Sequence, residues 1–199
     1  MIFRIVSLAV LIVAIIWLNN ALRARKLSIG QIVKWWRSEF KDALALLDEK
    51  GYSDPTALRR VAYLFGLDLV TVLAITGLLQ PWILGDHMSG ALLMLHMVAA
   101  PLFAISLIVF TVLTAYSQRY TADDNSMVMK LKACFWGIII LGLTAILTST
   151  LSMFPLANMD LQYWLIGIHR WAAIALLVLL MVYGYFVAVV YYKPMEVKK

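Results

Sequence analysis

The chain has 199 residues, of which 63% are hydrophobic and only 14% are charged, and its mean hydropathy is +0.87. Soluble domains are nearer to half apolar and a quarter charged, so this composition excludes an ordinary soluble protein and indicates an integral membrane protein. The single cysteine, Cys134, excludes a disulfide framework, an iron–sulfur cluster and a cysteine-based zinc site built from this chain alone. The formal net charge is +6, but the basic residues flank apolar segments, so we expect no nucleic-acid partner.

Five apolar stretches are long enough to cross a hydrocarbon core about 30 Å thick, which takes roughly 20 residues of helix. They lie at about 2–20, 61–85, 89–116, 132–156 and 163–192. The first could be a signal peptide, but no small-x-small cleavage pattern precedes the basic run from Arg23, so we expect an uncleaved anchor. The predicted organisation comprises an N-terminal anchor, an interfacial segment, a four-helix bundle and a cytoplasmic tail at 1–22, 23–57, 58–192 and 193–199.

The segment between the first two spans predicts an amphipathic helix. Apolar residues recur at helical spacing from Ile29 to Leu47, with basic side chains on the other face. Such a helix would lie in the cytoplasmic interface, with its tryptophans at the level of the lipid headgroups. The alternative is a docking surface for a partner subunit.

Lysine and arginine are distributed unequally between the two sides of the predicted bundle. Nine lie between residues 21 and 60, three in loop 117–132 and three in the C-terminal tail, whereas the loops near 85–88 and 157–162 have none. Loops rich in these residues remain on the cytoplasmic side of a membrane. The sequence therefore predicts a multi-pass protein with its N-terminus outside and its C-terminus in the cytoplasm.

Two histidines, His96 and His169, stand in different apolar segments, each about two turns in from a nearly uncharged outer loop. At 1.5 Å per residue they lie roughly 10 Å and 9 Å below the outer boundary. An ionisable side chain at such depth is costly and marks a candidate functional site. Two imidazoles at one depth on separate helices could hold a haem iron from opposite faces of the porphyrin. The alternative is that both form hydrogen bonds within the bundle.

Three further residues are candidates for cofactor binding. Arg170 is the only arginine of the four-span core outside its cytoplasmic ends, and a guanidinium there would suit anionic haem propionates. Its alternative role is to extend to lipid headgroups. Gly77 and Gly90 would give a porphyrin room between helices. Methionines at the same level are expected to line the pocket: Met88, Met94, Met97 and Met153.

The outer turn before the third span carries the candidate catalytic residues, Asp86 and His87. A histidine titrates near neutral pH, so His87 could accept a proton from a quinol bound beside the haem. The alternative is an ordinary solvated loop histidine. Asp68, on the cytoplasmic side of the second span, could belong to a proton or quinone path. We favour instead an ion pair with a basic residue at the inner helix ends: Arg59, Lys130 or Lys132.

Several stretches, taken in order, give the chain a resemblance to a known family. They are Ile75-Thr76-Gly77, Gly90 with His96, Ser152-Met153-Phe154-Pro155-Leu156 and Ile168-His169-Arg170-Trp171. Over about residues 58–192 the chain resembles the b-type cytochrome membrane subunits of formate dehydrogenase and membrane-bound nickel–iron hydrogenase. The resemblance implies a four-helix bundle in a bacterial inner (cytoplasmic) membrane that holds two stacked haems and exchanges electrons with a quinone.

The chain departs from this pattern in the cytoplasmic half of the bundle. The family has one histidine around Arg60-Val61-Ala62-Tyr63 and another near Val109-Phe110, and this chain has neither. Only three histidines are present, so the resemblance implies a single haem b on the outer side. The expected fold is an all-α integral membrane protein, with a four-transmembrane-helix haem-binding bundle preceded by an N-terminal anchor helix and an interfacial amphipathic helix.

A single outer haem predicts an electron-transfer subunit of a quinone-linked oxidoreductase complex. It would transfer electrons, in either direction, between the quinone/quinol pool and a periplasmic redox partner, such as cytochrome c or another redox subunit. We expect it to work in a hetero-oligomeric complex surrounded by membrane lipid. The alternative is a haem-free structural or anchoring subunit of such a complex. A small transporter is less favoured, because the sequence has no internal repeat and no polar cluster at mid-membrane.

Overall fold

The computed structural model describes residues 2–25, 27–50, 55–83, 88–154 and 158–191. In these ranges all regular secondary structure is helical, and the helices are α1 (Ile2–Ala24), α2 (Ile29–Lys50), α3 (Pro55–Ile83), α4 (Gly90–Thr114), α5 (Ser126–Met153) and α6 (Met159–Tyr191). Each of them except α2 contains a stretch long and apolar enough to cross a membrane. The chain is therefore an all-α, multi-pass membrane protein with five candidate spans. The predicted tail, 193–199, lies outside the described residues.

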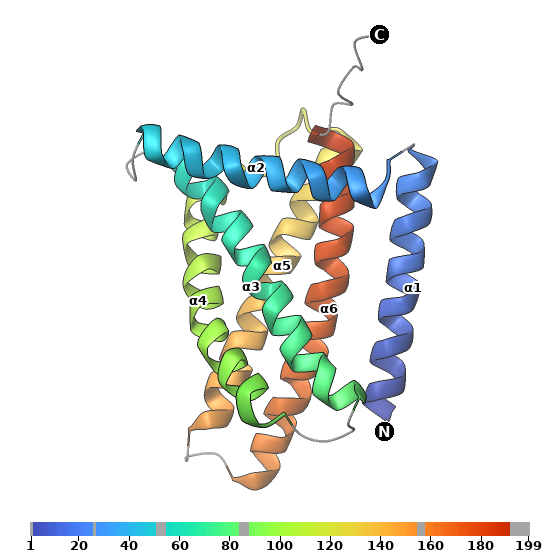
Figure 1. The fold of residues 1–199 in the computed structure, drawn as a ribbon, viewed down its shortest axis with the longest axis vertical. Coiled ribbons are helices and arrows are strands. Elements are labelled where there is room, and N and C mark those ends of the chain that lie inside the picture. The colour runs from blue at the N-terminus through green and yellow to red at the C-terminus, as the bar shows by residue number, and fades with distance from the viewer. Residues whose placement is uncertain (1, 26, 51–54, 84–87, 155–157, 192–199) are drawn as a thin grey trace.

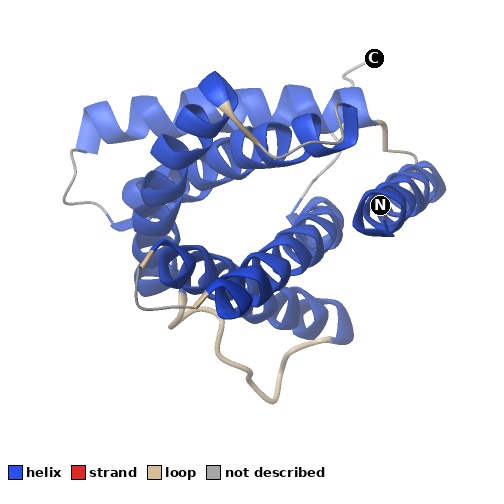
Figure 2. Ribbon diagram, turned by 90° about the horizontal axis from the view of Figure 1, so that it is seen from below, coloured by secondary structure: helices blue, strands red, loops and turns tan. Residues whose placement is uncertain are grey.

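Helices α3 to α6 form a bundle of two helix pairs (Figure 1). α3 packs along α4, where the Ser106 hydroxyl donates a 2.7 Å hydrogen bond to the carbonyl of Ala62, and α5 packs along α6. α3 and α6 make little contact with each other. Viewed from below, α1 stands beside these four helices (Figure 2), and α2 lies across one end of them. Between the two pairs, the backbones approach each other mainly through α4 and α5, while side chains from all four helices form one core.

Two helices begin earlier than the sequence predicts. The fourth span is expected from about residue 132, but α5 begins at Ser126, so half of the predicted loop 117–132 is helical. The side chain of Asn125 causes this early start, because it accepts hydrogen bonds from the backbone N–H groups of Met127 and Val128 at 3.0 and 2.9 Å. α6 begins at Met159 instead of near 163 and has 33 residues. Its length of about 50 Å exceeds the roughly 40–45 Å of a bilayer with its headgroups.

The bundle is apolar both inside and outside. Its core consists of closely packed buried side chains, among them Val70, Phe103, Leu107, Phe135, Ile138 and Leu176. Large apolar side chains also cover the outward faces, where Met94 is 73%, Val112 72% and Ile140 64% exposed. Water-soluble monomers rarely expose apolar surface of this extent, whereas lipid covers it at no cost. The exterior therefore supports the assignment as a membrane protein independently of helix length.

A buried ammonium ties the α4–α5 loop to the bundle. Lys132 is 7% exposed, and its Nζ donates to the carbonyl of Arg119 at 2.6 Å and to both carboxylate oxygens of Asp124 at 2.8 and 2.7 Å. Lys132 therefore pairs with Asp124, whereas we expected it as one of three possible partners of Asp68. The Lys132 ammonium, together with the backbone N–H of Thr121, holds the pKa of the Asp124 carboxyl below its ordinary value.

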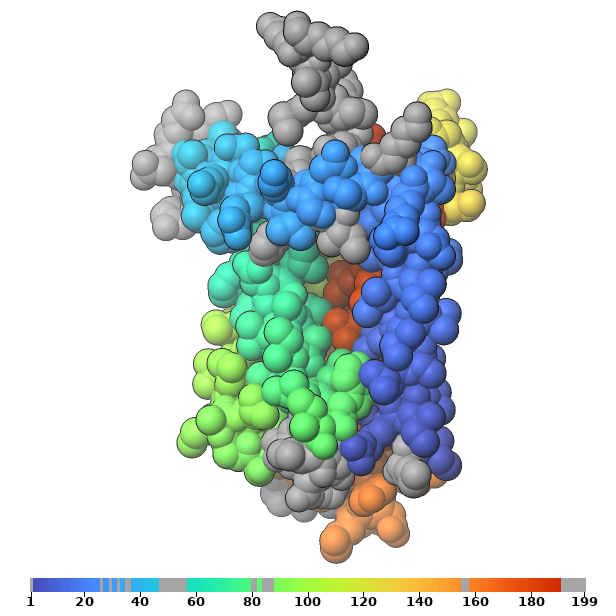
Figure 3. Space-filling model, turned by 45° about the vertical axis from the view of Figure 1, so that its right-hand side comes forward, coloured from blue at the N-terminus to red at the C-terminus, as the bar shows by residue number. Residues whose placement is uncertain are grey.

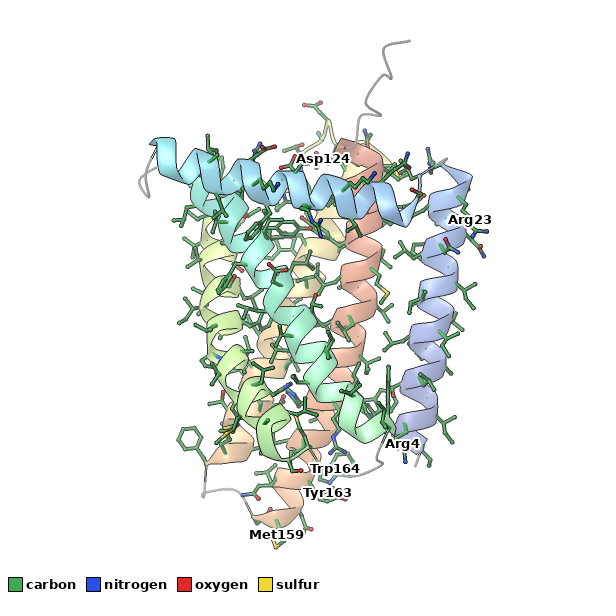
Figure 4. The ribbon with its side chains drawn as sticks, in the orientation of Figure 1. Arg4, Arg23, Asp124, Met159, Tyr163 and Trp164 are labelled. Carbon is green, nitrogen blue, oxygen red and sulfur yellow. The ribbon has the colours of Figure 1, made fainter. Side chains whose placement is uncertain are left out.

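The charged residues mark the two ends of the molecule. Arg23 and Asp124 lie at the end crossed by α2, and Arg4 lies at the opposite end (Figure 4). The end near Arg4 also carries Met159 and Tyr163, which project beyond the bundle and are 86% and 79% exposed. We call the Arg4 end outer and the Asp124 end inner, in keeping with the predicted topology.

Candidate cofactor site

The two membrane histidines lie side by side inside the bundle. His96 comes from α4 and His169 from α6, so they belong to different helix pairs. Their ring centroids are 6.4 Å apart, and the ring planes meet at 80°. The two histidines that lie at the same depth in the sequence are therefore also neighbours in the folded protein, as we expected.

A neighbouring hydroxyl fixes the tautomer of His96. Its Nδ1 lies 2.9 Å from the Oγ1 of Thr76. That hydroxyl has one proton, which it donates to the carbonyl of Val72 at 2.8 Å, with the carbonyl of Leu73 further away at 3.2 Å. The threonine oxygen must then accept from the imidazole, so we assign the proton of neutral His96 to Nδ1. The Nε2 lone pair of His96 is left for another partner.

A backbone carbonyl fixes the tautomer of His169. Its Nδ1 lies 2.9 Å from the carbonyl oxygen of Ala145 on α5. A carbonyl only accepts, so this nitrogen carries the proton. In the described ranges, the hydrogen bonds located at a ring nitrogen involve Nδ1 in both histidines, and the carbonyl of Leu73 is a further acceptor for the His96 ring. Both imidazoles are therefore held as metal-binding histidines usually are, with Nδ1–H donated to a protein oxygen and Nε2 as the candidate ligand atom.

The spacing of the rings suits one shared metal ion. Each metal–nitrogen bond is about 2 Å long, so two imidazoles on opposite sides of one ion have ring centres about 6 Å apart. An edge-to-face contact without a metal covers the same range of distances, so the spacing is compatible with a metal but does not require one. Two imidazoles are too few for a closed zinc site, and the described part of the chain contains no group of three metal-binding side chains. A porphyrin brings four nitrogens of its own, so this donor set fits haem.

A cavity of about 220 Å³ adjoins the two rings. Its wall is mostly apolar and comes from all four bundle helices, with Met88 before α4 and Phe3 of α1 as additional members. The other methionines that we expected here lie elsewhere: Met94, Met97 and Met153 are 73%, 50% and 66% exposed on the exterior. Their helical positions turn them away from the bundle axis, which their depth in the sequence does not reveal.

The two candidate glycines have different surroundings. Gly77 lines the cavity, and a Cβ atom added to it would lie 3.2 Å from Cε1 of His96. The glycine therefore leaves the space that the His96 ring occupies. Gly90 does not line the cavity, and no atom lies within 4 Å of a Cβ built there. It has φ +60 at the start of α4, a conformation that glycine adopts without strain, so its role in this structure is to begin the helix.

Arg170 lies at the edge of the cavity. It is among the lining residues although its side chain is exposed, and its Cζ lies 5.9 Å from the centre of the Phe3 ring. Such a guanidinium can meet an anionic group at the cavity mouth while its other face rests on the aromatic ring. The predicted catalytic residues, Asp86 and His87, lie outside the described residues.

Three groups at this site are not among the residues that the sequence singled out for it. They are the hydroxyl of Thr76, the carbonyl of Ala145 and the ring of Phe3. Thr76 lies twenty residues before His96, and Ala145 twenty-four before His169, so no local pattern connects them. A hydroxyl within an apolar span, directly before Gly77, is the one signal that could have drawn attention to Thr76.

Aromatic rings fill the inner half of the bundle, where the resemblance would imply a second haem. The rings of Tyr63 and Phe110, at the positions near which histidines are missing, contact each other with centroids 5.5 Å apart. Tyr183 lies 6.3 Å from Tyr63, and the fully buried Phe135 lies 5.6 Å from Phe110. The cavity left beside them is only about 40 Å³. The residues present there do not suit a second porphyrin.

Comparison of the chain with protein-family models, with curated proteins and with solved structures gives no match. The function therefore has to be inferred from the fold and from the geometry of the site.

Proposed function

We propose that the protein is a membrane-embedded b-type cytochrome subunit, with a single haem held between His96 and His169 near the outer face. The observation that carries this proposal is the state of the two imidazoles. In both rings Nδ1 contacts a protein oxygen, and the ring centres are 6.4 Å apart beside a cavity, with Nε2 as the proposed ligand atom. Metal-binding histidines usually donate Nδ1–H in this way. Any buried imidazole needs such an acceptor, so the pairing of the two rings beside one cavity is what supports a shared ligand.

The surroundings support a haem in preference to a bare metal ion. The cavity wall is largely apolar, Gly77 leaves room at the His96 ring, and Arg170 offers a positive charge at the mouth. When bound, haem supplies a one-electron iron couple. The protein would orient it through Thr76 and Ala145, and would keep water away with the apolar wall.

The position of the site near the outer end limits which partners could exchange electrons with the proposed haem. The aromatic cluster of Tyr63, Phe110, Phe135 and Tyr183 occupies the inner half, so the described residues offer one candidate haem position and no second one toward the inner end. The proposed role is therefore exchange of electrons between the quinone/quinol pool and a periplasmic redox subunit, both at the outer face, within a hetero-oligomeric complex. His87 is the proposed acceptor of the quinol proton.

A haem count tests the proposal directly. The protein is purified in detergent from haem-sufficient cells, and a pyridine haemochrome assay is combined with a reduced-minus-oxidised spectrum. We expect about one low-spin b-type haem per chain. His96→Ala and His169→Ala should each lose it, whereas His87→Ala, which removes the third histidine, should retain it.

Two outcomes would contradict the proposal. If both variants kept the haem and its spectrum, the ligand assignment would be wrong. If the unmodified protein contained no haem, the haem-free anchoring subunit would replace the cytochrome as the proposed function. The rate at which added quinol reduces the haem in the His87→Ala variant then tests the proton acceptor separately, because slower haem reduction at unchanged haem content is expected.

A further inference from the structure

The outer end of α1 is attached to the bundle by specific polar contacts. The Arg4 guanidinium donates from Nη2 to the carbonyl of Trp82 at 2.7 Å, and the Trp82 indole donates to the hydroxyl of Ser7 at 3.1 Å. The carbonyl of Trp82 lies in the last turn of α3, where carbonyls lack a partner within the helix, and the positive side chain of Arg4 suits that end. Ser7 is 0% exposed. A helix that served only to hold the chain in lipid would need none of these contacts.

Phe3 connects the outer end of α1 to the candidate cofactor cavity. Its ring meets that of Trp171 edge-on, with centroids 5.1 Å apart, and the guanidinium of Arg170 lies over it. Among the described residues of α1, Phe3 alone lines the cavity. It thus touches the two residues that directly follow His169 in the sequence.

Two of the helices that line the cavity, α3 and α6, make little contact with each other, and α1 contacts both of them. In Figure 3 the outer end of α1 meets the end of α3, while further toward the inner end a hollow separates these helices and exposes α6. The second aromatic contact of α1, between Trp17 and Tyr185, lies near its inner end, with centroids 5.5 Å apart. Among the described residues of α1, those of its first turn are therefore the ones that can cover the cavity.

We propose that α1 is the fifth wall of the cofactor site, with Phe3 as its positioning residue. Phe3 closes the side of the cavity between α3 and α6, and its ring holds the Arg170 guanidinium at the mouth, where that charge can meet the carboxylates of a porphyrin. Arg4 and Ser7 fix the register of α1 so that Phe3 reaches the cavity. This inference rests on the proposed haem function, but the attachment of α1 does not.

A matched pair of variants tests the role of Phe3. Phe3→Ala and Trp17→Ala each remove one aromatic contact between α1 and α6, but only Phe3 borders the cavity. Haem loss is followed as transfer to excess apomyoglobin. We expect Phe3→Ala to lose haem at least several-fold faster than the unmodified protein, Phe3→Leu to restore slow loss in part, and Trp17→Ala to leave the rate unchanged. Equal rates for Phe3→Ala and Trp17→Ala would overturn the role of Phe3.

A haem-independent experiment tests the attachment of α1. In a Cys134→Ser background, a Phe3→Cys/Trp171→Cys pair should be joined by a short bifunctional thiol cross-linker that spans the space of the two lost rings, and a Phe3→Cys/Tyr185→Cys pair should not. The intact mass of the purified chain should include α1. Absence of the first cross-link, or a mass showing removal of α1, would overturn the inference even if haem is present. Absence of haem together with efficient cross-linking would instead count against the proposed function alone.

Discussion

Thr76 and His96, twenty residues apart on neighbouring helices, share a hydrogen bond of 2.9 Å that decides which nitrogen of the imidazole can bind a metal. The threonine hydroxyl also contacts the carbonyl of Val72 on its own helix at 2.8 Å, so we assign the donor role to the histidine. In the proposed function, this contact orients His96 as a ligand.

Replacing Thr76 by valine should therefore weaken haem binding. The variant keeps the shape of the side chain but leaves Nδ1–H of His96 without its acceptor, and loss of such a supporting contact typically costs roughly 10- to 100-fold in metal affinity. Haem titration into the apo-protein measures the change. Thr71→Val is the matched control, because Thr71 lies on the same helix and its hydroxyl bonds only to the carbonyl of Leu67. Equal affinity in the two variants would contradict the role of Thr76.

Alanine at position 77 should disturb the same ligand by crowding. A helical glycine replaced by alanine ordinarily gains about 0.5–1 kcal/mol of stability. At Gly77 the added Cβ would lie 3.2 Å from the His96 ring, whereas at Gly184 it would meet no atom within 4 Å. We expect Gly184→Ala to raise the thermal midpoint slightly, and Gly77→Ala to lower haem content without that gain. Full haem content in Gly77→Ala would show that the ring can shift without consequence.

The sequence predicts the spans and the pairing of the histidines well, because both follow from simple periodic physics. Apolar length sets the helices, and counting residues inward sets the depth of His96 and His169. It does not predict what holds the rings, since the contacts of Thr76 and Ala145 depend on how separate helices pack. The early start of α5 is an intermediate case: Asn125 is a recognisable cap, but its effect competes with the polar character of the residues after it.

The aromatic cluster of the inner half should resist conversion into a second haem site. In a Tyr63→His/Phe110→His variant, two imidazoles would stand at the positions near which the resemblance implies haem ligands. Tyr183 and the fully buried Phe135 would still occupy the space around them. We expect the pyridine haemochrome count to remain at about one haem per chain. A count of two would show that ligands alone, and not space, limit the inner site.

The contact between Lys132 and Asp124 should make the inner end sensitive to acid. Because the folded protein lowers the pKa of Asp124, the pair contributes stability above the ordinary carboxyl pKa of about 4, and this contribution is lost as the pH falls through the lowered value. Asp124→Asn should therefore lower the thermal midpoint at pH 7, and lower it less near pH 3. Asp123→Asn, at the adjacent exposed position, should be neutral at both. An undiminished difference at pH 3 would contradict the assignment.

The division of the bundle into two helix pairs has a thermodynamic consequence. His96 belongs to the α3–α4 pair and His169 to the α5–α6 pair, so a group bound by both would cross-link two halves whose backbones approach each other mainly through α4 and α5. Any ligand that binds only the assembled state stabilises it by mass action. Cofactor supply would then govern how much of the chain survives quality control in the membrane, and a shortage would be felt first as separation of the two hairpins.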